Sequence, residues 1–535
     1  MDADVIIVGG GPTGLMLAGE LRLAGARPLV LERRTEPGQV PRANGLGGQI
    51  LQLLRYRGLL ERFEAAGGGP VRSGDRFPFG GVHLDLAGLA DPPLQALRLP
   101  QPQLERVLAE RARELGAEIR AGHEVVGVSQ DAAAVTAEVH GPDGSYPLTA
   151  RYLAGCDGAR SRVRELAGIS FPGATYPELN RLGQVAIGRG VTKLGNGDLG
   201  VPGLGTVRAG FTTTDRGVFA VGSVSTGELL IQTTELQAAE VDDDAPMTLA
   251  ELDGSIRRVL GAALPLGEPS RLSRYQFQAR QARRYREGRI LLAGDAAHLL
   301  PATGAALNLG LLDAVNLAWK LAADVRGWGP PDLLDSYHQE RHLAGTRALL
   351  QTQAQVALRR GHDPAADALR AVFTELLADE QPQRRLAAMI AGTDVRYPAP
   401  GPGDHPLVGT FAPDLAMPGQ PGGPAATSVA ELMRPAQPVL LMLVDRPGLR
   451  EMASHWQDRV DIHPAAGPTE AERVTQADRL ADALLIRPDA RVAWAAAVGE
   501  PGETAGPALG SALARWFGAP LAASATASMS TTDRS

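Results

Sequence analysis

The first residues of the chain that could do chemistry are glycines. The apolar run at residues 5–8 leads directly into Gly9, Gly11 and Gly14, which are spaced as G-x-G-x-x-G. Gly9 allows a tight turn, Gly11 lets a pyrophosphate approach the backbone, and Gly14 lets the next helix lie close to the strand. That helix starts near Thr13, and the positive end of its dipole points at the phosphate. The pattern predicts a dinucleotide site.

An acidic residue stands where such a site needs one. The second apolar strand, at residues 29–31, ends at Glu32. A carboxylate roughly 20 residues beyond the glycines accepts hydrogen bonds from a ribose in dinucleotide-binding folds. Glycine spacing alone is weak evidence, but the strand, turn, helix and acid together favour dinucleotide binding over an ordinary glycine-rich turn.

Composition limits the class of protein. A chain of 535 residues is too long for one core and predicts two or three domains. The net charge of -7, without a basic block, argues against a nucleic-acid partner. Cys156 is the single cysteine, which excludes an intramolecular disulfide and a multi-cysteine metal site, and we expect no metal. Without a signal peptide or a long apolar run, we expect a soluble cytoplasmic protein with no membrane partner.

Three segments follow the second strand. Helical spacing predicts helices at residues 49–65, interrupted near Gly58, and at residues 103–115. Residues 171–285 are rich in strand-like runs, whereas the chain after residue 289 repeats a buried strand and ends it at Gly294-Asp295. His298 beside that apolar run is expected to be structural. The C-terminal part predicts a small α/β domain.

Three motifs stand in order along the chain: the N-terminal glycine turn, Asp157-Gly158, and Gly294-Asp295 followed by Pro301. Each is common alone, but the ordered set resembles the class A flavoprotein monooxygenases, the FAD-dependent aromatic hydroxylases. Within that family the chain looks most like the bacterial polyketide-tailoring oxygenases of the angucycline, tetracycline and aureolic acid type.

The resemblance implies an α/β architecture. A Rossmann-like FAD-binding domain of the glutathione reductase type would be combined with an interleaved β-rich substrate domain and a thioredoxin-like C-terminal domain. The implied limits are residues 1–170 and 286–395 for FAD binding, with middle-domain strands near 72–100, then 171–285 for substrate, 405–520 for the thioredoxin-like domain and 521–535 for a disordered tail. The thioredoxin-like domain has no cysteine, so we expect a packing or dimer role rather than dithiol chemistry.

The resemblance also implies roles for residues that match the family motifs. Glu32, with Arg33 beside it, would bind the adenosine ribose of FAD. Arg42 would reach the flavin and pyrophosphate, the side chain of Gln101 would contact FAD, and the backbone of Val125 would contact the adenine.

The later motifs complete the implied site. Asp157 and Arg160 belong to the motif that serves both FAD and NADPH, and Asp295 would bind the ribityl hydroxyls. Pro301 begins the loop along the isoalloxazine, and Arg42 and Pro301 are the expected catalytic residues. The backbone of the next segment would contact the flavin pyrimidine through Ala306, Leu307 and Asn308. Where the family usually has Gly-Gly-Gln-Gly, this chain has residues 303–307 as Thr-Gly-Ala-Ala-Leu, so side-chain packing against the ring should differ.

The implied activity is that of a monooxygenase. NADPH, or NADH, would reduce FAD, and oxygen would then add at the flavin C4a carbon as a peroxyflavin. We therefore expect hydroxylation of an aromatic polyketide intermediate in antibiotic biosynthesis. Three alternatives stay open: Baeyer-Villiger insertion at a polyketide ketone, a flavin reductase or dehydrogenase that does not activate oxygen, and a flavin-bearing protein that only binds a drug. Assembly as a homodimer is also open.

Overall fold

The computed structural model describes residues 1–38, 43–74, 76–89, 91–195, 197–223, 227–235, 246–301, 304–360, 363–398, 404–417, 427–464 and 481–521. Arg42 and Thr303 lie outside these ranges, as do residues 522–535 of the expected tail. Leu521, the first residue of that tail, is described, and its N–H donates to the carbonyl of His455 at 2.8 Å.

A parallel sheet forms the centre of the N-terminal domain. Its strands run in the order β8-β2-β1-β11-β21, and every neighbouring pair is parallel. Their bounds are Glu118–Ala121, Pro28–Glu32, Ala3–Val8, Gly144–Gly155 and Ile290–Leu292. Helix α1 (Pro12–Leu23) packs against α7 (Ala306–Val325) and α4 (Gln101–Glu114). The central apolar strands are buried, as expected for parallel strands. The predicted Rossmann-like core is therefore confirmed.

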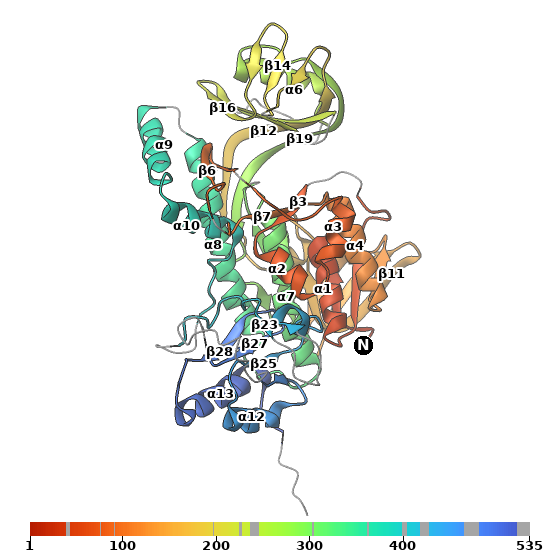
Figure 1. Ribbon diagram of the computed structural model, residues 1–535. Coiled ribbons are helices and arrows are strands. Elements are labelled where there is room, and N and C mark those ends of the chain that lie inside the picture. Colours follow the sequence, from red (N-terminus) through yellow and green to blue (C-terminus); the bar gives the residue numbers. More distant parts are fainter. Residues whose placement is uncertain are drawn as a thin grey trace, which may run out of the picture.

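A six-stranded antiparallel sheet forms a second lobe. Two long strands, β12 (Gly173–Ile187) and β19 (Leu266–Gln281), rise from the first domain into this lobe (Figure 1). The strand order is β16-β17-β18-β12-β19-β22, the remaining strands being Gly210–Thr214, Gly217–Ser223, Glu228–Glu235 and His298–Leu299. Helix α6 (Leu249–Leu260) covers the sheet with Leu252 and Ile256 in a separate apolar core.

The strands between residues 72 and 100 form two small sheets with local neighbours. They do not join the six-stranded sheet: β7 (Gln95–Arg98) lies between β3 (Gly45–Gly47) and β4 (Arg72–Ser73) and pairs with both, while β5 (Arg76–Phe79) and β6 (Val82–Asp85) form their own hairpin. All four strands are short, at two to four residues each.

Helices cover the remaining surface of the first domain. The predicted break near Gly58 separates α2 (Gln49–Tyr56) from α3 (Leu60–Gly67), and Gly58 has a φ of 63°. The helix α8 (Asp335–Arg359) runs from the centre towards α9 (Pro364–Leu376) and α10 (Glu380–Ala391) (Figure 1). Among the described residues, no helix combines the length and apolar character needed to span a membrane.

The C-terminal domain has a four-stranded sheet in the order β26-β25-β27-β28. These strands are Asp461–His463, Val439–Met442, Ala483–Ile486 and Val492–Ala496. The first pair is parallel and the other two pairs are antiparallel, and α12 (Pro447–Ala453) and α13 (Gly502–Phe517) pack together on the sheet. A β-α-β unit followed by a hairpin and a helix is the thioredoxin-like arrangement, as the resemblance implied.

Candidate active site

Four predicted residues lie along one edge of the parallel sheet. Gly9 follows β1, Glu32 ends β2, Asp157 follows β11 and Asp295 follows β21. The carboxyl ends of neighbouring parallel strands meet at the same edge, which is where open α/β sheets bind ligands. The glycine turn and Glu32 thus lie along the same edge as Asp157 and Asp295, which are far away in the sequence.

The glycine turn fits a pyrophosphate. A Cβ at Gly9 would lie 2.4 Å from the carbonyl oxygen of Cys156, and a Cβ at Gly14 would lie 2.0 Å from that of Gly9. A Cβ at Gly11 would meet no described atom within 4 Å. Helix α1 has no side-chain cap, with Pro12 at its first position. Gly9 and Gly14 therefore permit close packing, whereas Gly11 and the unpaired first-turn amides face space that an anion can fill.

Glu32 is held at the end of β2 by its neighbours. One carboxylate oxygen accepts from the Gly10 N–H at 2.7 Å, and the other accepts from the backbone N–H and the Nε of Arg34, both at 2.9 Å. Burial raises the pKa of Glu32, but the hydrogen bonds from Arg34 and Gly10 outweigh it and leave the pKa below its ordinary value. Glu32 is therefore an ionised acceptor beside the glycine turn.

Arg34 rather than Arg33 contacts Glu32. Arg33 is exposed, and the sequence reasoning missed Arg34. Arg34 lies two residues beyond the end of β2, where no strand periodicity could have revealed its contact with Glu32. The His123 N–H donates to the Glu32 carbonyl at 2.9 Å, so β9 (Glu124–Gln130), which carries the buried Val125, starts beside Glu32.

Asp157 organises the middle motif. Its carboxylate accepts from the Ser161 hydroxyl at 2.5 Å and from the Val163 N–H at 3.0 Å, at the start of α5 (Arg162–Leu166). The predicted Arg160 is exposed nearby. The missed residue is Arg164, which donates to the carbonyl of Ala296 at 3.0 Å. Arg164 thereby ties the Asp157 motif to the Gly294-Asp295 motif.

Thr13 joins the first and third motifs. A Cβ at Gly294 or at Gly310 would lie 2.7 Å from its hydroxyl oxygen, so Thr13 packs closely between these two glycines. Asp295 is exposed in the short 3-10 helix Gly294–Ala296, and Pro301 is buried further along. Helix α1, helix α7 and the Gly294-Asp295 turn are therefore fixed as one unit.

The buried side chain of Asp313 holds the Gly294-Asp295 turn in place. Asp313 accepts from the Gly294 N–H at 3.0 Å and from the Arg341 Nε at 2.7 Å, and it lies 2.7 Å from the Nε2 of His298. Burial raises the pKa of Asp313, but the charge of Arg341 and the contact with His298 outweigh it and lower the pKa. His298 is structural, as predicted, while Asp313 and Arg341 carry no local motif that would reveal them.

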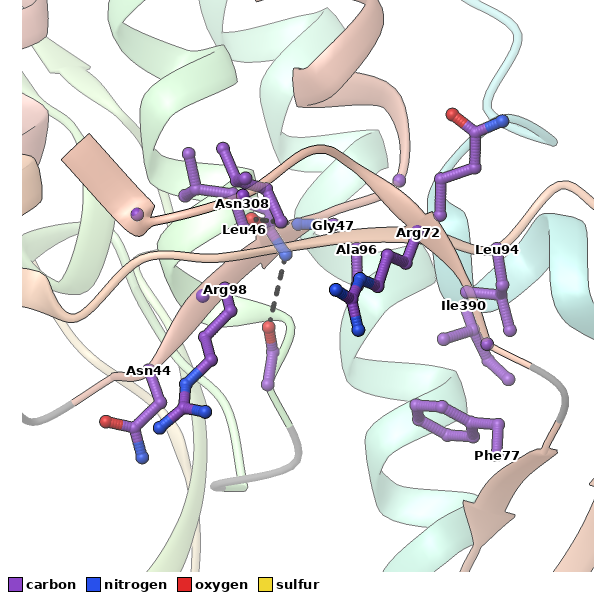
Figure 2. A pocket seen from close by; sticks show the side chains of 18 of the residues that line it. Asn44, Leu46, Gly47, Arg72, Phe77, Leu94, Ala96, Arg98, Asn308 and Ile390 are labelled. Carbon is purple, nitrogen blue, oxygen red and sulfur yellow. Dashed lines mark hydrogen bonds between the residues drawn. The ribbon is translucent and has the colours of Figure 1, made fainter. Parts of the chain in front are cut away.

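The start of α7 faces a cavity. The helix begins with Ala306 and Leu307. The residue before them, Ala305, has no side chain that could cap the helix. Asn308 accepts from the Gly47 N–H at 3.1 Å and donates to the Gly304 carbonyl at 3.2 Å (Figure 2). The first amides of this 20-residue helix, which the Ala305 side chain does not cap, and its positive dipole suit the electron-rich edge of a flavin pyrimidine.

The cavity has a volume of about 840 Å³, within the range of sites for flat organic ligands. It lies between the β3-β7-β4 sheet, the start of α7, and helices α8 and α10 (Figure 2). Its apolar side chains include those of Phe77, Leu94 and Ile390. Gln101 starts the adjacent helix α4 and donates to Glu105 at 2.8 Å, and its neighbours Pro100 and Gln103 line the cavity.

Comparisons with known proteins agree with this geometry. Residues 2–352 match the FAD binding domain family, and residues 405–520 match the aromatic-ring hydroxylase C-terminal family. The chain therefore belongs to the FAD-dependent aromatic-ring hydroxylases, the class A flavoprotein monooxygenases, as the motifs implied. It is an FAD-dependent monooxygenase by family.

Individual relatives cover nearly the whole chain. The 12-dehydrotetracycline 5-monooxygenase/anhydrotetracycline 6-monooxygenase of Streptomyces rimosus is 41% identical, over 97% of this chain and 100% of its own. The rifampicin monooxygenase of Streptomyces venezuelae is 39% identical and the dialkyldecalin synthase of Streptomyces rugosporus 37% identical, each over 97% of this chain and 99% of its own. The solved structure of CabE, an aromatic hydroxylase from angucycline biosynthesis, has a TM-score of 0.85 at 38% identity and covers 97% of this chain and 100% of its own.

Proposed function

We propose that this protein hydroxylates an aromatic polyketide intermediate of antibiotic biosynthesis with FAD, NADPH and oxygen. The observation that carries the proposal is the position of the cavity. A space of about 840 Å³ with apolar side chains in its wall opens onto the uncapped start of α7, the helix that packs against α1 of the glycine motif. Relatives whose names specify tetracycline and rifampicin monooxygenases support a large polycyclic substrate.

The site suits FAD in an extended conformation. Gly11 and the first amides of α1 would bind the pyrophosphate, Glu32 the adenosine ribose, Asp295 the ribityl chain, and the start of α7 the pyrimidine ring. When bound and reduced, FAD supplies the activation of oxygen. The protein binds and orients the ring and excludes water from it. Roles for Arg33, Arg42, Gln101, Val125, Asp157, Arg160 and Pro301 belong to the same proposal.

The nicotinamide and the assembly are further parts of the proposal. The described residues form one dinucleotide fold, and FAD would occupy it, so NADPH would bind transiently in a groove. We also propose the domain limits 1–170 with 286–395, 171–285 and 405–520, and a homodimer as the assembly. The strands near residues 72–100 are assigned to the first domain because they pair with β3 or with each other.

One relative favours a second candidate function. The dialkyldecalin synthase is named for a reaction other than oxygenation, and residues 304–307 of this chain depart from the usual glycine-rich loop. A flavoprotein that binds a polycycle without activating oxygen is therefore the alternative. Insertion of oxygen beside a ketone is the alternative within the oxygenase class.

Product analysis with purified, FAD-loaded protein separates these functions. We expect NADPH oxidation to rise with a polycyclic phenol, and the product to gain one oxygen atom as a hydroxyl that acetic anhydride acylates. A lactone that opens in mild base would indicate insertion. A product of unchanged mass would support the synthase-like alternative and contradict the proposal. Parallel reactions with NADH test the choice of nicotinamide.

A further inference from the structure

The small β3-β7-β4 sheet presents a face with few side chains to the cavity. Gly45 pairs with Arg98, while Gly47 and Arg72 both pair with Ala96. Because alternate residues of a strand share a face, these five residues lie on one side of the sheet. All five line the cavity, and the side chains of Arg72 and Arg98 extend into it (Figure 2).

The glycines leave this face flat. A Cβ at Gly45 would lie 2.5 Å from the carbonyl oxygen of Leu97, and a Cβ at Gly47 would lie 3.1 Å from that of Gln95. Close strand pairing therefore disfavours any larger residue at Gly45. Apart from the two arginines, the only side chain on this face is the methyl group of Ala96. A planar ring system can therefore lie flat against the sheet.

Positively charged side chains gather at this face of the cavity. Arg72, Arg76 and Arg98 line it, whereas no Asp or Glu is among the described residues that do so. In the described part of the chain, Arg72 is exposed to the cavity and forms no ion pair or hydrogen bond. The opposite wall is apolar, with Phe77, Leu94 and Ile390 (Figure 2). Such a wall lowers the local dielectric and strengthens the attraction of a guanidinium for an anion.

We propose that Arg72 selects a planar substrate that carries an oxygen anion, as an ionised enol, a phenolate or a carboxylate. The ring system lies on the face of Gly45, Gly47 and Ala96, and its anionic oxygen accepts from the Arg72 guanidinium. A planar guanidinium with several N–H donors suits such an oxygen pair better than an ammonium group does. This inference rests on the proposed function, since it names the substrate class of the same cavity.

Matched acids and neutral derivatives test the inference. The probes are anthraquinone-2-carboxylate with its methyl ester, for the carboxylate, and alizarin with its dimethyl ether, for the phenolate. Their affinity for FAD-loaded protein is measured by fluorescence titration. Wild-type protein should bind at least one anion about 10-fold or more tightly than its neutral derivative, as one charge-assisted hydrogen bond allows.

Variants show whether Arg72 causes that preference. Arg72→Gln should weaken binding of the preferred anion about 10-fold and leave its neutral derivative unchanged, and Arg72→Lys should restore part of the loss. Arg106→Gln, an exposed change on α4 outside the cavity, is the matched control and should behave as wild type. Thermal unfolding and FAD content verify that each variant is folded.

Three results would overturn the inference. The first is equal binding of anions and neutral derivatives by the wild-type protein, and the second is an equal loss of affinity for both in Arg72→Gln. The third is a loss of FAD affinity in that variant, which would assign Arg72 to the flavin. The proposed function fails separately. If Arg72 controls anion binding but no product gains oxygen, the inference stands and the oxygenase function does not. If oxygenated product forms without any preference for anions, the oxygenase function stands and the inference fails.

Discussion

Arg487 of the C-terminal domain and Glu340 of helix α8 form a buried ion pair across 147 residues of sequence. The two guanidinium NH2 groups lie 2.5 and 2.8 Å from the two carboxylate oxygens. Glu340 also accepts from Lys320 at 2.7 Å, and Arg487 contacts Asp489 at 2.5 Å. With no cysteine for dithiol chemistry, the C-terminal domain packs against the FAD-binding domain through this charge network. The sequence left a packing or a dimer role open for this domain, and these contacts are its packing within the chain.

Removal of one charge from this pair should destabilise the protein strongly. Glu340→Gln leaves Arg487 and Lys320 buried without their shared carboxylate, which costs about 3–5 kcal/mol of unfolding free energy. Denaturant unfolding followed by tryptophan fluorescence measures the change. The control is Glu380→Gln, which removes an exposed pair with Arg384 and should cost about 0.5 kcal/mol or less. Equal effects of the two variants would show that the buried pair does not hold the domains together.

The same charge network makes the stability of the protein depend on pH. Burial raises the pKa of Glu340, but the charges of Arg487 and Lys320 outweigh it and hold the pKa well below its ordinary value. A carboxylate with a lowered folded-state pKa stabilises the protein above its unfolded pKa of about 4.3, and this stability is lost as the pH falls further. The pKa values of the buried Asp313 and Asp489 carboxyl groups are lowered as well. The melting temperature should therefore fall steeply below about pH 4.5. A flat profile from pH 6 to pH 3 would contradict this origin of stability.

Two glycine substitutions separate cofactor binding from folding. Gly11→Ala places a methyl group in open space, so the free protein should keep its stability while FAD affinity drops about 10-fold or more. Gly14→Ala places its Cβ 2.0 Å from a backbone oxygen and should prevent correct folding. Isothermal titration with FAD and thermal unfolding of the FAD-free protein measure both properties. Unchanged FAD affinity in Gly11→Ala would remove Gly11 from the proposed pyrophosphate site.

Local sequence patterns were enough to predict the residues at the edge of the parallel sheet, but not the buried residues that hold them in place. Gly9, Glu32, Asp157 and Asp295 were predictable because each follows an apolar strand, and strand periodicity and turn residues are local properties. The contacts of Asp313 were not, because they join distant segments. The strands at residues 72–100 were expected from the sequence, but their pairing was not, since pairing depends on neighbours that no local pattern names.

The buried support of the Gly294 turn should matter for the cofactor. Asp313→Asn removes the charge that faces Arg341 and weakens the contacts with Gly294 and His298. We expect a lower melting temperature together with reduced FAD content after purification, because the turn that carries Asp295 loses its anchor. Full FAD occupancy at wild-type stability would show that the turn is held by its own backbone.

Oxygen labelling tests the central claim most directly. FAD-loaded protein is incubated with NADPH, a planar polycyclic phenol and ¹⁸O₂, and the product mass is measured beside NADPH consumption. A monooxygenase should place one ¹⁸O atom in the product for each NADPH consumed under well-coupled conditions. A product without ¹⁸O, or NADPH oxidation that yields only hydrogen peroxide with every substrate tried, would contradict the account.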